Sequence, residues 1–292
     1  MFINNLLLKK SKLLFISIVA FLLTITNTHR RLKMSLYKNK VLSYCPEGAE
    51  YEPFTKINSF SSKGRCTRIA GIKTNRIHHL LSDNQLRAFL IWENNSRIID
   101  IRESYPLLDL MEVIDDTEGL AIDKFINKET GKQRVLTTSF LLTVREADRS
   151  IYYKARAVRN NSELEKKLTM EKYEIERRYW TALGIEWRLV TDRDLSDYKQ
   201  YCRNIQWFRE TLIDNGECVE DKAKLSEELF CYFKNNKRII VKEALKSFEK
   251  DFGLQKGVGL YLLRYLLALR KIKIDLKQQI NIILKIQDLI IF

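Results

Sequence analysis

The chain has 292 residues, enough for one large domain or two ordinary ones. An apolar fraction of 45% can fill a core, and 30% of charged residues of both signs with only 3 prolines exclude long disordered tracts. The net charge of +14 favours a polyanionic partner, nucleic acid before an acidic membrane surface. The five cysteines are scattered without a C-x-x-C pair, which argues against a zinc site and for reduced thiols in the cytoplasm.

The N-terminus carries an uncharged, mostly apolar stretch at residues 13–25. It is shorter than the ~20 residues needed to cross a bilayer, and no small-x-small cleavage site follows it. Met34 stands directly after this region, where a polar, basic sequence begins. We therefore expect residues 1–33 to be an extension that is not part of the mature protein. The alternative is a membrane-tethered basic regulator anchored by residues 13–25, and we expect no membrane partner otherwise.

The next elements are predicted from apolar periodicity. Turn-forming residues make the segment up to residue 73 loop-rich. Apolar residues at three- and four-residue spacings predict an amphipathic helix over residues 77–92, capped by Ser82 or Asp83. The segment "RIIDIRE" at residues 97–103 then predicts a strand.

A strand, a hairpin partner, a long helix and another strand follow. The segment "VLTTSFLLTV" at 135–144 predicts a buried strand whose apolar run is interrupted by three hydroxyl side chains. Apolar and polar residues alternate over residues 151–158, which predicts a hairpin partner for this strand. Lysine and glutamate pairs at helical spacing predict a helix over residues 162–184, which ends at a glycine. Residues 186–191 complete the unit as a strand. This order predicts a small α/β core with helices packed on a central sheet.

The C-terminal part predicts a second domain over residues 225–292. Its pattern indicates a helix, a turn at residues 252–255, a helix at 257–270 and a strand at 271–276, which is the layout of a winged helix. Five basic side chains could face DNA phosphates there, with a solvated face or a partner surface as the alternative. They are Lys256, Arg264, Arg270, Lys271 and Lys273.

Several segments also carry a family resemblance. They are "KTNRIHHLLSDNQLRAFL" (73–90), "IIDIRESYPLL" (98–108), "VLTTSFLL" (135–142), "LTMEKYEIERRYW" (168–180), "VTDRDL" (190–195) and "NIQWF" (204–208). In these segments the chain resembles the TnsA family, the endonuclease subunit of heteromeric cut-and-paste transposases. The resemblance implies a restriction-endonuclease-like α/β core at residues 34–210 and a helical, winged-helix-like C-terminal domain. It further implies cleavage at the 5′ ends of transposon DNA, with a transposase subunit and an AAA-type regulator as partners.

The resemblance also locates the family's catalytic positions in this chain. They fall on Gln85 for the helix carboxylate, Ser139 for the strand aspartate, Ala157 for the polar residue and Arg159 for the lysine. An amide and a hydroxyl hold Mg²⁺ poorly, and a guanidinium cannot replace a compact ammonium without other atoms moving. We therefore predict a catalytically impaired pseudoenzyme with an architectural role in DNA transposition, with no metal ion and no other cofactor.

Two alternatives remain open at this point. The protein could be an active endonuclease that binds Mg²⁺ through relocated carboxylates, taken from Asp83, Asp115, Asp116 or Asp123. It could be the product of a decaying gene. Without the family resemblance, the serine in the middle of the strand at 135–144 would read simply as a residue that hydrogen-bonds a neighbour.

Overall fold

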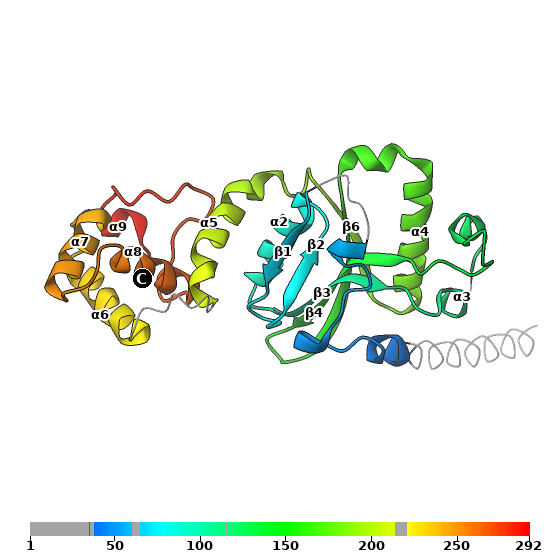
Figure 1. Cartoon of the computed structure of the whole chain (residues 1–292), viewed down its shortest axis with the longest axis horizontal. Coiled ribbons are helices and arrows are strands. Elements are labelled where there is room, and N and C mark those ends of the chain that lie inside the picture. The colour runs from blue at the N-terminus through cyan, green and yellow to red at the C-terminus, as the bar shows by residue number, and fades with distance from the viewer. Residues whose placement is uncertain (1–34, 36–37, 60–64, 115, 214–220) are drawn as a thin grey trace, which may run out of the picture.

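The computed structural model describes residues 35, 38–59, 65–114, 116–213 and 221–292. A four-stranded sheet with helices on both sides forms the centre, and a group of helices forms the C-terminal end (Figure 1). The described strands are β1 (Thr67–Ala70), β2 (Ile77–Leu80), β3 (Ile98–Pro106), β4 (Thr137–Arg145), β5 (Ile151–Arg159) and β6 (Glu186–Thr191). The described α-helices are α2 (Asp83–Glu93), α3 (Leu110–Val113), α4 (Lys167–Ala182), α5 (Lys199–Arg209), α6 (Lys222–Asn235), α7 (Val241–Asp251), α8 (Val258–Ala268) and α9 (Ile286–Leu289).

The central sheet has the strand order β3-β4-β5-β6. Strands β3, β4 and β5 pair antiparallel, whereas β6 pairs parallel with β5 after the chain has crossed over through α4. Ser104 in β3 has a positive φ of 48°, an uncommon conformation for a residue other than glycine. Its neighbour Glu103 packs with the α2 side of the sheet and Tyr105 with the α4 side, so the chain changes face here.

The sheet separates two hydrophobic clusters, because successive side chains of a strand point to opposite faces. The cluster on the α2 face includes Phe89, Leu90, Phe140, Leu142 and Val158. The cluster on the α4 face includes Leu141, Ala155, Ile175, Tyr179 and Trp180. Each fully buried Val, Leu, Ile or Phe side chain contributes roughly 1.5–3 kcal/mol to stability, so both helices are held firmly on the sheet.

Most of the predicted helices and strands are present at the predicted residues. The strands at β3 to β6 match the predicted segments, and α4 begins at Lys167 after a short 3₁₀ helix and ends before Gly184, whose φ is +66°. The N-cap of α2 is Ser82, one of the two residues predicted to cap the helix. The prediction of a helix over residues 77–92 was wrong at its start, because Ile77–Leu80 is a strand that pairs with β1.

The C-terminal part continues the core of the α2 face. Leu229, Phe233, Phe248, Leu262 and Leu266 of α6, α7 and α8 belong to the same cluster as Phe89 and Phe140. The predicted helix, turn and helix are present as α7 and α8. The strand predicted at 271–276 is reduced to a single bridge between Lys273 and Ile291, because the chain there meets only one residue of the tail.

None of the helices in the described ranges is both long enough and apolar enough to span a bilayer. The segment at 13–25, proposed above as an alternative tether, lies outside the described residues.

Candidate functional site

Gln85 lies in the first turn of α2 and is only 2% exposed. Its side-chain Oε1 accepts a hydrogen bond from the backbone N–H of Leu81 at 2.8 Å, and its own backbone N–H donates to Ser82 Oγ at 3.2 Å. This arrangement is similar to a capping box, in which two side chains satisfy the free N–H groups of a helix start. The amide oxygen of Gln85 is therefore used to begin α2.

Ser139 lies in β4 at the point where the pairing of β4 with β5 ends. The last paired residues are Phe140 and Arg156. Beyond them the backbone N–H of Val158 donates to Ser139 Oγ at 2.9 Å, and both residues are buried. The hydroxyl thus satisfies a buried N–H group that the strand pairing leaves free, which would otherwise cost about 1–3 kcal/mol.

Ala157 and Arg159 lie in β5 on either side of Val158. Ala157 is buried and has no polar side-chain atom. Arg159 donates to the carbonyl of Val158 at 3.2 Å, and its Nε lies 3.7 Å from Glu163 Oε2. Its side chain is 31% exposed, so the guanidinium remains accessible at the edge of the site.

The four predicted positions gather at one end of the sheet. The side chain of Asn84 donates to Asn160 Oδ1 at 2.6 Å, which places the start of α2 beside the end of β5. Ser139, Ala157 and Arg159 lie around the backbone of Val158. No hydrogen bond among the described residues joins the Gln85 side chain to these three.

A magnesium ion does not fit the donors present at these positions. Mg²⁺ prefers carboxylate oxygens and gives up its waters reluctantly. Here the available oxygens are an amide and a hydroxyl, and each already accepts a backbone hydrogen bond. Within the described ranges, no group of three or more His, Cys, Asp and Glu residues is placed to hold a metal ion.

The carboxylates considered as replacements lie elsewhere. Asp83 is half-exposed on α2 and pairs with Arg65, whose Nε is 2.9 Å away. Asp116 lies 3.4 Å from Arg178 on α4, and Asp123 lies in a 3₁₀ helix at Ile122–Phe125. Asp115 is outside the described residues.

A buried polar cluster between β4 and α4 was not foreseen. Glu176 Oε2 accepts from Thr138 Oγ1 at 3.1 Å, and Thr138 Oγ1 in turn accepts from Trp180 Nε1 at 2.7 Å. Lys172 Nζ lies 3.4 Å from Glu176 and donates to the carbonyl of Thr137 at 3.1 Å. Burial lowers the pKa of Lys172, and the nearby Glu176 carboxylate partly offsets this. The hydroxyl of Thr138 in β4 therefore has a structural partner.

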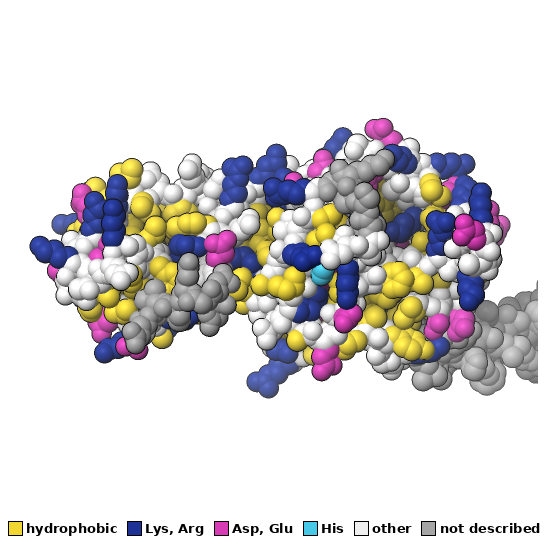
Figure 2. All heavy atoms as spheres, in the orientation of Figure 1, with side chains coloured by type: hydrophobic (Ala, Val, Ile, Leu, Met, Phe, Trp, Pro, Cys, Tyr) yellow, Lys and Arg dark blue, Asp and Glu magenta, His cyan; other side chains and the backbone are white. Residues whose placement is uncertain are grey.

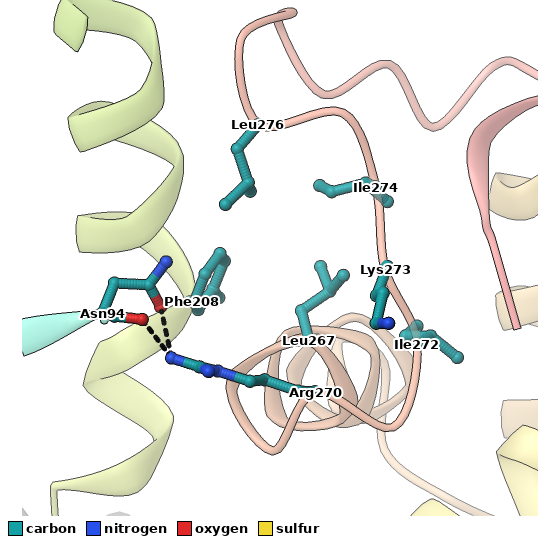
Figure 3. Close-up of a pocket in the computed structure, with 8 residues that line it drawn as sticks. All are labelled: Asn94, Phe208, Leu267, Arg270, Ile272, Lys273, Ile274 and Leu276. Atoms are coloured by element: carbon teal, nitrogen blue, oxygen red, sulfur yellow. Dashed lines mark hydrogen bonds between the residues drawn. The ribbon is translucent and has the colours of Figure 1, made fainter. Parts of the chain in front are cut away.

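Three of the basic residues proposed for DNA contact are engaged within the chain. Arg264 donates to the carbonyl of Trp207 at 2.8 Å, and Lys271 lies 2.9 Å from Glu227. Arg270 reaches from the end of α8 to Asn94 at the end of α2, beside a cavity of about 270 Å³ lined mainly by apolar side chains (Figure 3). Lys256 and Lys273 make no side-chain contact of this kind with other described residues.

Helix α8, which would be the recognition helix of a winged helix, is largely covered. It packs against α5, α6 and α7, and Leu262, Leu263 and Leu266 are buried. A recognition helix needs a free face to enter the major groove of DNA. The winged-helix assignment and the five DNA-contact residues therefore stay predictions.

Apart from the short α3, the order is α2-β3-β4-β5-α4-β6. This order, with an antiparallel hairpin followed by a parallel crossover strand, is that of a restriction-endonuclease-like core. Two family models match the chain: "TnsA-like endonuclease N terminal" at residues 95–192 and "TnsA endonuclease C terminal" at residues 198–276. The chain is also similar to "Transposon Tn7 transposition protein TnsA" of Escherichia coli, with 36% identity over 162 residues. That alignment spans 55% of this chain and 56% of the relative. The protein belongs to the TnsA family, as its sequence predicted.

Proposed function

We propose that this protein supports DNA transposition as an architectural subunit that does not cut DNA. One observation carries the proposal: the oxygens of Gln85 and Ser139, at the positions where we place the family's two carboxylates, are hydrogen-bonded to backbone N–H groups of the fold. A side chain that completes a helix start or a strand end is retained for stability whether or not a metal ion binds. The two positions thus have a structural use that is independent of cleavage.

The missing charges explain why cleavage is not expected. In metal-dependent cleavage, carboxylates hold Mg²⁺, and the ion lowers the pKa of a bound water that attacks the phosphate. With two carboxylates absent, the site has lost two negative charges that would attract the ion. Arg159 keeps a positive charge, and a guanidinium binds phosphate oxygens well while always remaining protonated. The site would thus bind a phosphate without activating water.

In this proposal the protein holds transposon-end DNA and docks with the transposase subunit and the AAA-type regulator of the same element. The resemblance to the family supports these partners. The net charge supports DNA, because residues 34–292 still carry 14 minus 6, or +8, without the six basic residues of residues 1–33. The 5′ strands stay uncut while the transposase processes the 3′ ends. This combination favours a cointegrate product over a simple cut-and-paste insertion.

The second candidate is an active endonuclease with relocated ligands. Asp83 and Asp192 line the same surface groove, which is the observation that favours it. A metal ion there would have to compete with Arg65, which already pairs with Asp83, and with the backbone N–H of Asn161, which donates to Asp192 at 2.6 Å.

The test is nicking of a transposon-end duplex with Mg²⁺ or Mn²⁺ by the full chain together with the element's transposase. A Gln85→Glu, Ser139→Asp, Arg159→Lys variant serves as the revertant, and an Asp83→Asn variant tests the relocated site. We expect no nicking by the unchanged protein, normal binding of DNA and transposase, and nicking by the revertant. Nicking by the unchanged protein would overturn the proposal, and its loss in Asp83→Asn would establish the relocated site.

A further inference from the structure

A surface groove runs between α2 and α5, beside the four predicted positions. It has two parts, with volumes of about 580 Å³ and 330 Å³, which share Arg65, Asp83, Arg87 and Lys199 and are therefore continuous. The larger part extends over the loops that follow β5 and β6, and the smaller part follows α5 toward Arg203. We call this surface the α2–α5 groove.

The charge of the α2–α5 groove is strongly positive. Its lining contains the cations Arg65, Arg87, Arg193, Lys199 and Arg203 and the acids Asp83 and Asp192. Both acids are already engaged, Asp83 with Arg65 and Asp192 with a backbone N–H. By contrast, the side chains of Arg193, Lys199 and Arg203 are exposed and have no acidic partner among the described residues. The groove therefore presents free positive charge to solvent.

The free cations have a regular spacing along α5. Lys199 and Arg203 are four residues apart, so they lie on one face of the helix with a rise of about 6 Å between them. Arg87 faces them from α2, and its guanidinium is oriented by Asn84 Oδ1 at 2.9 Å. Figure 2 shows Lys and Arg side chains gathered over the upper end of α5 with few acidic side chains beside them. These cations can therefore face one polyanion together.

The lining chemistry distinguishes between two kinds of polyanion. An acidic helix would bind through an apolar face as well as through its charges. In the larger part of the groove the remaining lining residues are polar, namely Ser82, Asn84, Asn160 and Ser196. Hydroxyls, amides and basic side chains together are the groups that contact the sugar-phosphate backbone of nucleic acid.

We propose that the α2–α5 groove binds the phosphodiester backbone of DNA and leads it past the start of α2. The proposal deepens the function proposed above, because it assigns the DNA contact to α2 and α5 and not to α8. Asn84 and Asn160 line the groove and are hydrogen-bonded to each other where α2 starts and β5 ends, so a strand in the groove would pass the end of the sheet that carries the substituted positions. DNA binding would then have survived the change of the metal ligands, since the two depend on different residues.

The test compares two double variants of the full chain with the same loss of charge. Lys199→Gln/Arg203→Gln removes the two free cations of α5. Lys242→Gln/Lys246→Gln removes two exposed lysines of α7 that are also four residues apart and outside the groove. Binding of a fluorescent duplex is measured by anisotropy in EDTA, over roughly 50 to 400 mM salt, and polyglutamate is the competing probe. Far-UV circular dichroism confirms that both variants are folded.

We expect the slope of log affinity against log salt to fall by about 1.8 in the α5 variant, because each phosphate contact contributes about 0.9. If the two proteins bind equally at ~1 M salt, this slope corresponds to roughly 60-fold weaker binding at ~0.1 M. The α7 variant should keep the slope of the unchanged protein. Equal losses in both variants, an unchanged slope in the α5 variant, or a loss confined to polyglutamate binding would overturn the proposal.

The two proposals fail separately. Because binding is measured in EDTA, its outcome does not depend on whether the protein can nick DNA. Nicking by the unchanged protein would overturn the architectural role and leave the groove in place. If the protein does not nick DNA and its DNA binding does not depend on Lys199 and Arg203, the groove proposal fails and the architectural role remains.

Discussion

A buried ion pair between α2 and α5 sets the position of the groove walls. Glu93 near the end of α2 and Arg209 at the end of α5 have side chains that are 5% and 4% exposed, with 2.7 Å between Arg209 Nη2 and Glu93 Oε2. Glu93 also accepts from the backbone N–H of Ile72 at 2.7 Å, and Arg209 donates to the carbonyl of Ala70. Replacing Glu93 by Gln keeps the volume and removes the charge. Arg209 would then be left buried without its counter-ion.

The cost can be estimated from the burial of the pair. Breaking a buried pair by removing one partner destabilises a protein by about 3–5 kcal/mol, whereas an exposed pair contributes about 0–1 kcal/mol. We therefore expect Glu93→Gln to lower the free energy of unfolding by about 3 kcal/mol. A Glu93→Gln/Arg209→Met double variant should recover much of this loss, because no uncompensated charge remains.

Urea unfolding followed by far-UV circular dichroism measures these differences. Glu174→Gln is the matched control, since Glu174 pairs with Arg177 and Arg178 on the exposed side of α4 with its side chain 37% exposed. The control should lose less than about 1 kcal/mol. A loss in Glu93→Gln no larger than in the control would refute the view that this pair fixes α5 on α2.

Three further predictions concern single side chains. Burial opposes ionisation of Glu103, but the hydrogen bonds from Arg76 and His78 outweigh it and lower the pKa of Glu103 to about 2. The contribution of the Glu103 carboxylate to the free energy of unfolding is therefore complete above about pH 4.5 and is lost as the pH falls toward 2. Glu103→Gln should flatten this part of a series of urea midpoints measured against pH. Ser139→Ala should cost about 1–3 kcal/mol in the same urea assay because it leaves a buried backbone N–H without a partner, whereas Ser139→Asp keeps an acceptor and should cost less. Ser82→Ala should cost about 1 kcal/mol by thermal unfolding through loss of the N-cap, and no change would contradict the capping role.

Elements whose signals lie within their own segment could be predicted from the sequence. The bounds of β6 and the end of α4 before Gly184 follow from local alternation and from a glycine that adopts a positive φ. The N-cap Ser82 is equally local. The hydrogen bond of Gln85 could also have been foreseen, because Ser-x-x-Gln at a helix start is a capping-box pattern.

For β2 the prediction from the local sequence pattern was wrong. Its apolar spacing is compatible with a helix, but its backbone pairs with β1 and its His78 is buried against Glu103 with 2.8 Å between His78 Nδ1 and Glu103 Oε2. Both partners come from elsewhere in the chain. The contacts of the C-terminal cations are another such case. Only the packing of α8 on α5, and of α5 on α2, brings Arg264 to Trp207 and Arg270 to Asn94.

The sequence by itself determined the family, the central strands and α4, and it gave the prediction of where the family's four catalytic positions fall. Those features depend on residue types and on spacings within a segment. Only the tertiary structure decided how these residues are used: that Ser139 completes the end of a strand pairing, and that Arg87 and Arg203, more than one hundred positions apart, line one groove. Hydrogen bonds between strands and the electrostatic field of a groove depend on distances in space, and the folding of distant segments against one another sets those distances.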